Sequence, residues 1–152
     1  MNYNWQRYVE LAGRILLCSL FLMSSFSKIT NWSGTEAAMA SKGLPMVEVL
    51  LPIAVLFELG GALSVLLGYY ARLGALALFL FLIPTTLTFH NFWAVQGPDQ
   101  LNQIMHFMKN IVIMGGLLKV IADGAGAFSI DARRGKLVEA TVQARPTIRR
   151  AA

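Results

Sequence analysis

Charged residues are scarce in this chain, and they are unevenly placed. Only 14% of the 152 residues are charged and 56% are hydrophobic, whereas an average soluble domain carries roughly 25% charged residues. No formally charged residue occurs between Arg72 and Asp99. A soluble helical domain needs a polar face on each of its helices. The scarcity of charge therefore argues against an ordinary soluble domain and indicates that lipid is the solvent.

Cysteine is almost absent, which restricts thiol and redox chemistry. Cys18 is the single cysteine, so the chain cannot form an internal disulfide or a Cys-x-x-Cys relay. The sequence also lacks a zinc-finger spacing, a phosphate-binding loop and a glycine-rich dinucleotide fingerprint. We therefore expect no thiol relay and no metal site built on cysteine or acidic ligands within the chain, and we interpret Cys18 as a packing residue.

What the chain does contain is four apolar runs, at residues 8–27, 46–68, 72–93 and 104–122. Each run is about 20 residues long, which is enough to cross ~30 Å of hydrocarbon. The pattern predicts an all-α polytopic membrane protein with a bundle of four transmembrane helices. Residues 1–131 are expected to form the transmembrane domain, and residues 132–152 a polar, basic and flexible tail.

The net charge of +5 predicts an orientation in the membrane rather than nucleic-acid binding. Basic residues close to helix ends favour the cytoplasmic side, and here one set of ends carries far more of them. Both termini are thus expected in the cytoplasm, with residues 28–45 and 94–103 on the outer side. The larger set is Arg7, Arg72, Lys119, Arg133, Arg134, Lys136, Arg145, Arg149 and Arg150, and the smaller set is Lys28, Lys42 and Lys109.

Arg14 and Glu58 are charged residues inside the first and second apolar runs. An ionisable group in a bilayer costs about 3 kcal/mol on insertion scales and normally faces a partner in the bundle interior. Arg14 lies ~9 Å and Glu58 ~15 Å from the cytoplasmic ends of their runs, a difference that an arginine side chain can span. We therefore predict an intramembrane Arg14–Glu58 ion pair. Either it fixes helix register, or it handles protons or binds substrate.

A second polar group is predicted at the outer mouth of the bundle, where the third run ends and the fourth begins. Antiparallel neighbours bring these two ends together, and Lys28 ends the first run at the same level. The set is Lys28, His90, Trp93, His106, Lys109 and Asn110. Such a set could bind an anionic head group or a quinone carbonyl, or could only anchor the helices at head-group level. The two histidines also leave open a haem ligated from both sides.

Small residues at four-residue spacing indicate where helices pack closely. Gly60, Ser64 and Gly68 form such a stripe in the second run. Residues without large side chains let two transmembrane backbones approach each other. We expect this stripe to form a helix–helix contact and to have no chemical role.

The polar residues belong to an ordered series of short motifs that resembles the DoxX family, and the likeness covers about residues 8–131. The motifs are Arg14-Ile-Leu-Leu, Phe21-Leu-Met-Ser-Ser-Phe-Ser-Lys28, Ala40-Ser-Lys-Gly-Leu-Pro45, Phe57-Glu58-Leu-Gly60-Gly61, Leu67-Gly-Tyr-Tyr-Ala-Arg72, Phe89-His90-Asn-Phe92-Trp93, His106-Phe-Met-Lys109-Asn110 and Gly124-Ala-Gly126-Ala-Phe-Ser129-Ile-Asp131. The resemblance implies a bacterial four-helix protein of the inner membrane. It also implies that the protein, like some members, serves oxidation of sulfur compounds through quinone or oxidative-stress complexes in the membrane.

Three functions are compatible with these features. The first is a quinone-interacting or accessory subunit of a membrane redox system, at most part of an oxidoreductase, which needs a redox partner because the chain carries no cofactor motif. The second is a non-enzymatic scaffold or assembly factor, and the third is a carrier of small solutes. The expected partners are the lipid bilayer and a membrane or periplasmic protein or second copy of the chain. Nucleic acid is not expected.

Overall fold

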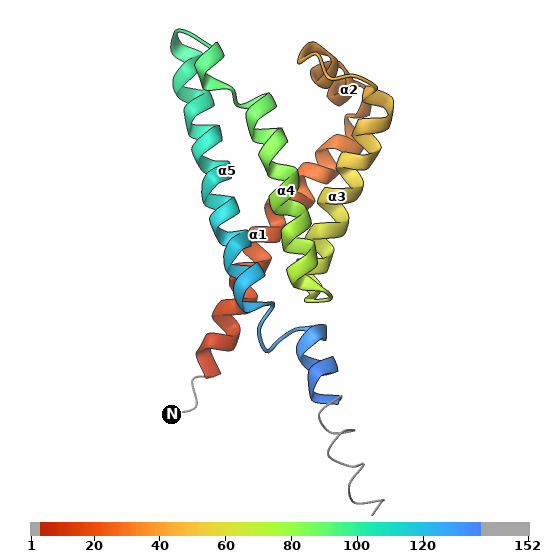
Figure 1. Cartoon of the computed structure of the whole chain (residues 1–152), viewed down its shortest axis with the longest axis vertical. Coiled ribbons are helices and arrows are strands. Elements are labelled where there is room, and N and C mark those ends of the chain that lie inside the picture. Colours follow the sequence, from red (N-terminus) through yellow and green to blue (C-terminus); the bar gives the residue numbers. More distant parts are fainter. Residues whose placement is uncertain (1–3, 138–152) are drawn as a thin grey trace, which may run out of the picture.

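The computed structural model describes residues 4–137, which contain helices and no strand (Figure 1). The elements are α1 (Asn4–Thr30), α2 (Trp32–Ser41), α3 (Val47–Leu67), α4 (Ala71–Phe89), the 3-10 turn η1 (Phe92–Ala94) and α5 (Pro98–Asp123). Within this range four helices, α1, α3, α4 and α5, are long and apolar enough to cross a membrane. The predicted all-α bundle with four transmembrane helices is therefore confirmed.

The helices differ from the apolar runs mainly at their ends. α1 and α5 begin earlier than predicted. Pro98 occupies the start of α5, where a backbone N–H has no partner within the helix, so proline loses no hydrogen bond there. The segment predicted as an outer loop contains the ten-residue helix α2. Residues 130–137 are helical as well, while the rest of the predicted tail, residues 138–152, lies outside the described part of the chain.

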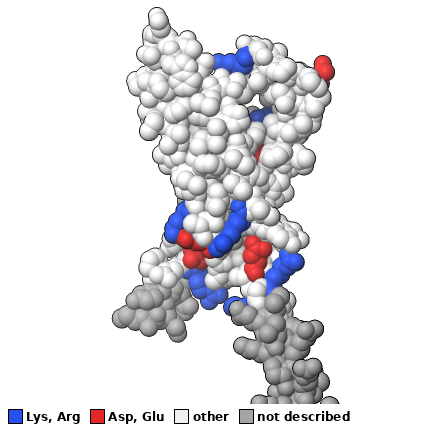
Figure 2. Space-filling view, viewed as in Figure 1, with Lys and Arg blue, Asp and Glu red and all other residues white. Residues whose placement is uncertain are grey.

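The two ends of the bundle carry different elements, and we name them accordingly (Figure 1). The start of α1, the turn between α3 and α4, and residues 124–137 lie at the basal end. Helix α2 and η1 lie at the apical end. Figure 2 shows a belt of charged side chains toward the basal end and an almost uncharged surface above it. The membrane-spanning helices carry exposed apolar side chains such as Leu16, Leu56 and Val112, as expected of helices in contact with lipid.

The basal half of the bundle is tightly packed. Its core contains the fully buried Cys18, together with Val65 and Leu117. Helices α3 and α4 approach closely, since a Cβ on Gly74 would lie 2.3 Å from Ser64 Oγ and 3.1 Å from Gly61 O. The predicted stripe is thus partly wrong, because the residues of contact are Gly61, Ser64 and Gly74. Gly60 faces open space, and Gly68 ends the helix.

Residues 124–131 close the basal end by docking on the turn between α3 and α4. The Asp131 carboxylate accepts hydrogen bonds from the backbone N–H groups of Tyr70 and Ala71, at 2.9 and 3.0 Å. The Asp131 N–H donates to Gly68 O at 2.8 Å. Asp131 therefore satisfies two donors at the start of α4 that have no partner within the helix.

Candidate functional site

A cavity of about 730 Å³ occupies the apical half of the bundle, and we name it the apical cavity. It lies where α3 and α4 diverge above their close contact (Figure 1). Figure 2 shows a hollow on this half with a few basic and acidic atoms visible inside it. Most of its wall is apolar, and Leu20, Phe21, Met39, Leu50, Phe81 and Leu82 belong to it. Its polar and charged side chains are Ser24, Lys28, Thr35, Glu58, Thr85, Thr88, His90, Lys109 and Asn110.

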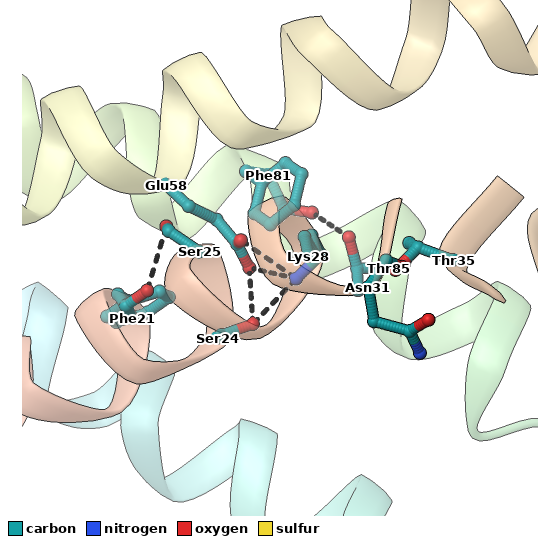
Figure 3. Close-up of polar contacts among 9 residues, drawn as sticks. All are labelled: Phe21, Ser24, Ser25, Lys28, Asn31, Thr35, Glu58, Phe81 and Thr85. Carbon is teal, nitrogen blue, oxygen red and sulfur yellow. Dashed lines mark hydrogen bonds and ion pairs between the residues drawn. The ribbon is translucent and has the colours of Figure 1, made fainter. Parts of the chain in front are cut away.

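Three side chains at the wall of the cavity form a hydrogen-bonded cluster, the Ser24–Lys28–Glu58 triad (Figure 3). The Lys28 ammonium lies 3.0 Å from Glu58 Oε1, 2.8 Å from Glu58 Oε2 and 2.6 Å from Ser24 Oγ. The Ser24 hydroxyl donates to Glu58 Oε1 at 3.1 Å. The side chain of Glu58 is 5% exposed and that of Lys28 is 23% exposed. A charged pair thus lies inside the membrane span and faces a ligand-sized space.

The predicted ion pair between Arg14 and Glu58 is not formed, because Glu58 is paired with Lys28. Arg14 instead donates to the carbonyl oxygens of Val65 and Phe128. Val65 lies seven residues beyond Glu58, which is about 10 Å along α3. Helix α1 also begins at Asn4, earlier than the apolar run. The antiparallel register therefore places Arg14 in the basal half and Lys28 beside Glu58.

Arg14 ties residues 124–131 to the bundle. Its side chain is 3% exposed, and its Nε is the one buried side-chain polar atom without a partner among the residues described. Close to it, a Cβ on Gly126 would lie 2.0 Å from Glu10 Oε2, and the Ala127 N–H donates to Glu10 at 3.3 Å. These contacts place Arg14 among groups that hold the basal end together, away from the apical cavity.

The histidines of α4 and α5 meet at the apical end. The rings of His90 and His106 stack with centroids 5.0 Å apart and an interplanar angle of 17°. His90 Nδ1 lies 3.1 Å from Gln103 Oε1, so this ring nitrogen donates to the amide oxygen. The Lys109 ammonium donates to His106 Nδ1 at 3.2 Å. Both imidazoles therefore have defined neighbours on α5.

Four of the six residues predicted at the outer mouth line the cavity, namely Lys28, His90, Lys109 and Asn110. His106 contacts the cavity residues His90 and Lys109 without lining it. Trp93 is 56% exposed and packs on Phe92 and Phe107, as an interfacial aromatic does. Sequence reasoning missed Ser24, although its spacing of four residues from Lys28 places both on one face of α1.

The polar groups fit an organic ligand better than a metal or a haem. Among residues 4–137 no group of three or more histidine, cysteine or acidic residues could hold a metal ion. The imidazoles of His90 and His106 face each other, whereas a haem iron needs two ring nitrogens pointing at it from opposite sides. A mostly apolar wall with a few polar groups suits a lipid-soluble molecule with a polar head.

The fold and the cavity define a multi-pass helical membrane protein with an intramembrane space large enough for a small molecule. Comparison with known proteins identifies it further. The chain belongs to the DoxX family, whose model matches residues 9–91. With its four candidate spans and two bacterial relatives that are inner membrane proteins, it is a multi-pass protein of the inner membrane.

Two bacterial relatives resemble most of the chain. Inner membrane protein YqjF of Escherichia coli is 39% identical over 121 residues, which are 80% of this chain and 88% of that protein. Inner membrane protein YphA of the same organism is 32% identical over 123 residues, 81% of this chain and 88% of that protein. A more distant match is the ER-derived vesicles protein ERV29 of Saccharomyces cerevisiae, 27% identical over 133 residues, 88% of this chain and 36% of that protein. No solved structure matches the chain significantly.

Proposed function

We propose that this protein binds a quinone-type molecule in the apical cavity and serves a membrane redox or oxidative-stress system as an accessory subunit. The observation that carries the proposal is the ion pair of Lys28 and Glu58 at the wall of an otherwise apolar cavity. Charged groups inside a membrane are costly and tend to mark sites of function. A volume of about 730 Å³ also lies within the usual range of ligand pockets.

The chain requires a partner to carry electrons. Cys18 is buried without a second cysteine, so it offers no dithiol couple. The protein would therefore supply binding and orientation while a membrane or periplasmic partner supplies the redox centre. This division of roles supports an accessory subunit over a complete enzyme.

The packed basal half favours a binding protein over a solute carrier. The apical cavity does not extend past the core that contains Cys18, Val65 and Leu117. Residues 124–131 dock below that core through Asp131 and Arg14. A carrier needs a second arrangement that opens this end, and the contacts of Arg14 with backbone carbonyls work against such an arrangement.

A comparison of two variants on one helix tests the proposal. Ala54 lines the cavity, so Ala54→Phe should fill it, whereas Leu56 is 70% exposed on the same helix and Leu56→Phe should leave it open. Mass spectrometry of lipids extracted from each purified protein measures the bound quinone. We expect Ala54→Phe to retain less than about a tenth of the wild-type amount, and Leu56→Phe to match the wild type. Equal amounts in all three proteins would overturn the proposal.

A further inference from the structure

In the triad, the hydrogen-bond donors are all used, whereas some acceptor sites are not. A lysine ammonium has three N–H donors and no acceptor, and Lys28 has three acceptor oxygens around it, two on Glu58 and one on Ser24. The single hydroxyl donor of Ser24 is directed at Glu58 Oε1. Among the described contacts of the triad, every donor is therefore already engaged.

The acceptors of the triad are not filled. Within the described part of the chain, Glu58 Oε1 receives both Ser24 and Lys28, whereas Glu58 Oε2 receives Lys28 alone. Ser24 Oγ accepts one bond, from Lys28. Since a carboxylate or hydroxyl oxygen can accept two hydrogen bonds, one site is left on Glu58 Oε2 and one on Ser24 Oγ. Both residues line the cavity, so the triad offers acceptors to a ligand.

The electrostatics of the triad add a second constraint on the ligand. Lys28 and Glu58 carry opposite charges and are paired, so the triad has no net charge. The triad therefore offers an anionic head no net attraction, and contact with Glu58 itself would be unfavourable. A quinone carbonyl is neutral, but it is an acceptor and would have to displace one of the bonds that Lys28 already makes. A neutral hydroxyl fits both constraints.

We propose that the apical cavity selects an apolar-tailed ligand with a phenolic hydroxyl, such as a hydroquinone, whose hydroxyl donates a hydrogen bond to Glu58 Oε2. This inference rests on the proposed quinone-type function and specifies that the reduced form is the form bound. The aromatic ring would lie between the apolar side chains of α3 and α4, Leu50 and Leu82 among them. At Glu58 only the reduced form can donate a hydrogen bond, so this residue favours retention of the hydroquinone over the quinone.

The decisive experiment compares three ligands on the wild-type protein in detergent without oxygen. The ligands are 2-decylhydroquinone, 2-decyl-1,4-benzoquinone and the dimethyl ether of the hydroquinone, and calorimetric titration measures each dissociation constant. We expect the hydroquinone to bind about tenfold or more tightly than the other two, because a hydrogen bond to a charged acceptor is lost in both. Equal or tighter binding of the quinone or the ether would overturn this inference alone. Failure of all three to bind would overturn the proposed function as well.

Two variants locate the selection at Glu58. Glu58→Gln should reduce the preference for hydroquinone over quinone to less than about threefold, because a neutral amide oxygen is a weaker acceptor. Glu48→Gln makes the same chemical change at the exposed start of α3 and should behave as the wild type. An unchanged preference in Glu58→Gln would contradict the assignment.

Discussion

Lys28 and Glu58 form a pair of charges that are costly to place in a membrane, so each residue needs the other as a partner. Each alone would leave an uncompensated charge in the hydrocarbon region, which insertion scales set at about 3 kcal/mol. Together, and with Ser24, they satisfy each other at 2.6 to 3.1 Å. For stability, the presence of a partner matters more than burial of the charge. Replacement of a whole buried pair by apolar residues is often neutral, whereas loss of one member is destabilising.

We therefore expect the variant Lys28→Met to lose roughly 3 kcal/mol of folding free energy, because Glu58 keeps its charge without a partner. The double variant with Glu58→Met as well should recover most of this loss. Denaturation in detergent, followed by circular dichroism, measures both. The matched control Lys42→Met removes an exposed lysine and should unfold as the wild type does. A double variant no more stable than Lys28→Met would show that the pair contributes more than mutual neutralisation.

For individual residues, the sequence predicted which charged side chains have partners in the bundle better than it predicted the partners themselves. Glu58 stood out because a carboxylate in an apolar run needs a partner, and Lys28 was expected at the outer mouth. The pairing of Arg14 with Glu58 was wrong because the level of each residue depends on where α1 begins and how the helices are aligned. Neither can be inferred from a count of apolar residues. Arg14 also finds its acceptor, Phe128 O, in a segment 114 residues away.

The shape of the apical cavity depends on the close contact between helices α3 and α4 in the basal half. There, Gly61 and Gly74 bring the two backbones together, and a Cβ on Gly61 would lie 2.7 Å from Leu78. Above this contact the helices diverge (Figure 1), and Pro84 removes one backbone hydrogen bond within α4. The close contact fixes the distance between α3 and α4 in the basal half, and their divergence above it leaves room for the apical cavity.

We predict that Gly74→Ala destabilises the protein by about 1–3 kcal/mol, because the added methyl group would meet the Ser64 side chain and force the helices apart. Gly60→Ala is the matched control on α3. Nothing lies within 4 Å of a Cβ there, so this change should be neutral or slightly stabilising. Thermal unfolding midpoints of the two variants in the same detergent measure the difference. If Gly60→Ala were the more damaging change, the assignment of the contact to Gly61, Ser64 and Gly74 would be incorrect.

The existence of the spans was predictable from the sequence because the hydrophobic thickness of a bilayer sets a length that apolar runs reveal directly. Helix α2 was not predictable in this way. It has ten residues and is held by packing, with Met39 buried against the bundle, so its order comes from tertiary contacts. The diverging helices that create the cavity also depend on packing and leave no periodic signal in the sequence.

At the scale of the molecule, the described residues carry unequal charge at the two ends of the bundle, and this inequality is the basis of the predicted orientation with both termini in the cytoplasm. Among residues 4–137 the basal end carries seven basic and three acidic residues, and the apical end three basic and four acidic residues. The basal set is Arg7, Arg14, Arg72, Lys119, Arg133, Arg134 and Lys136 with Glu10, Asp123 and Asp131. The apical set is Lys28, Lys42 and Lys109 with Glu36, Glu48, Glu58 and Asp99.

Labelling with a membrane-impermeant maleimide tests this orientation. Native Cys18 is fully buried and should remain unlabelled, so it need not be replaced. We expect Lys42→Cys, at the apical end, to be labelled in spheroplasts with an intact inner membrane, because the excess of basic residues predicts that the basal end lies in the cytoplasm. Lys119→Cys, whose side chain position is 77% exposed near the basal end, should be labelled only after the membrane is permeabilised. The reverse pattern would show that the protein has the opposite orientation.

The bonds from Asp131 to Tyr70 and Ala71 have a consequence for biogenesis. They join positions 61 and 60 residues apart in the chain. Because a ribosome makes the chain from its amino terminus, α4 enters the bilayer before the carboxylate that completes its first turn has been synthesised. During that interval the backbone N–H groups of Tyr70 and Ala71 are without the partner that they have in the folded protein. Docking of residues 124–131 on the turn between α3 and α4 would then follow the synthesis of α5.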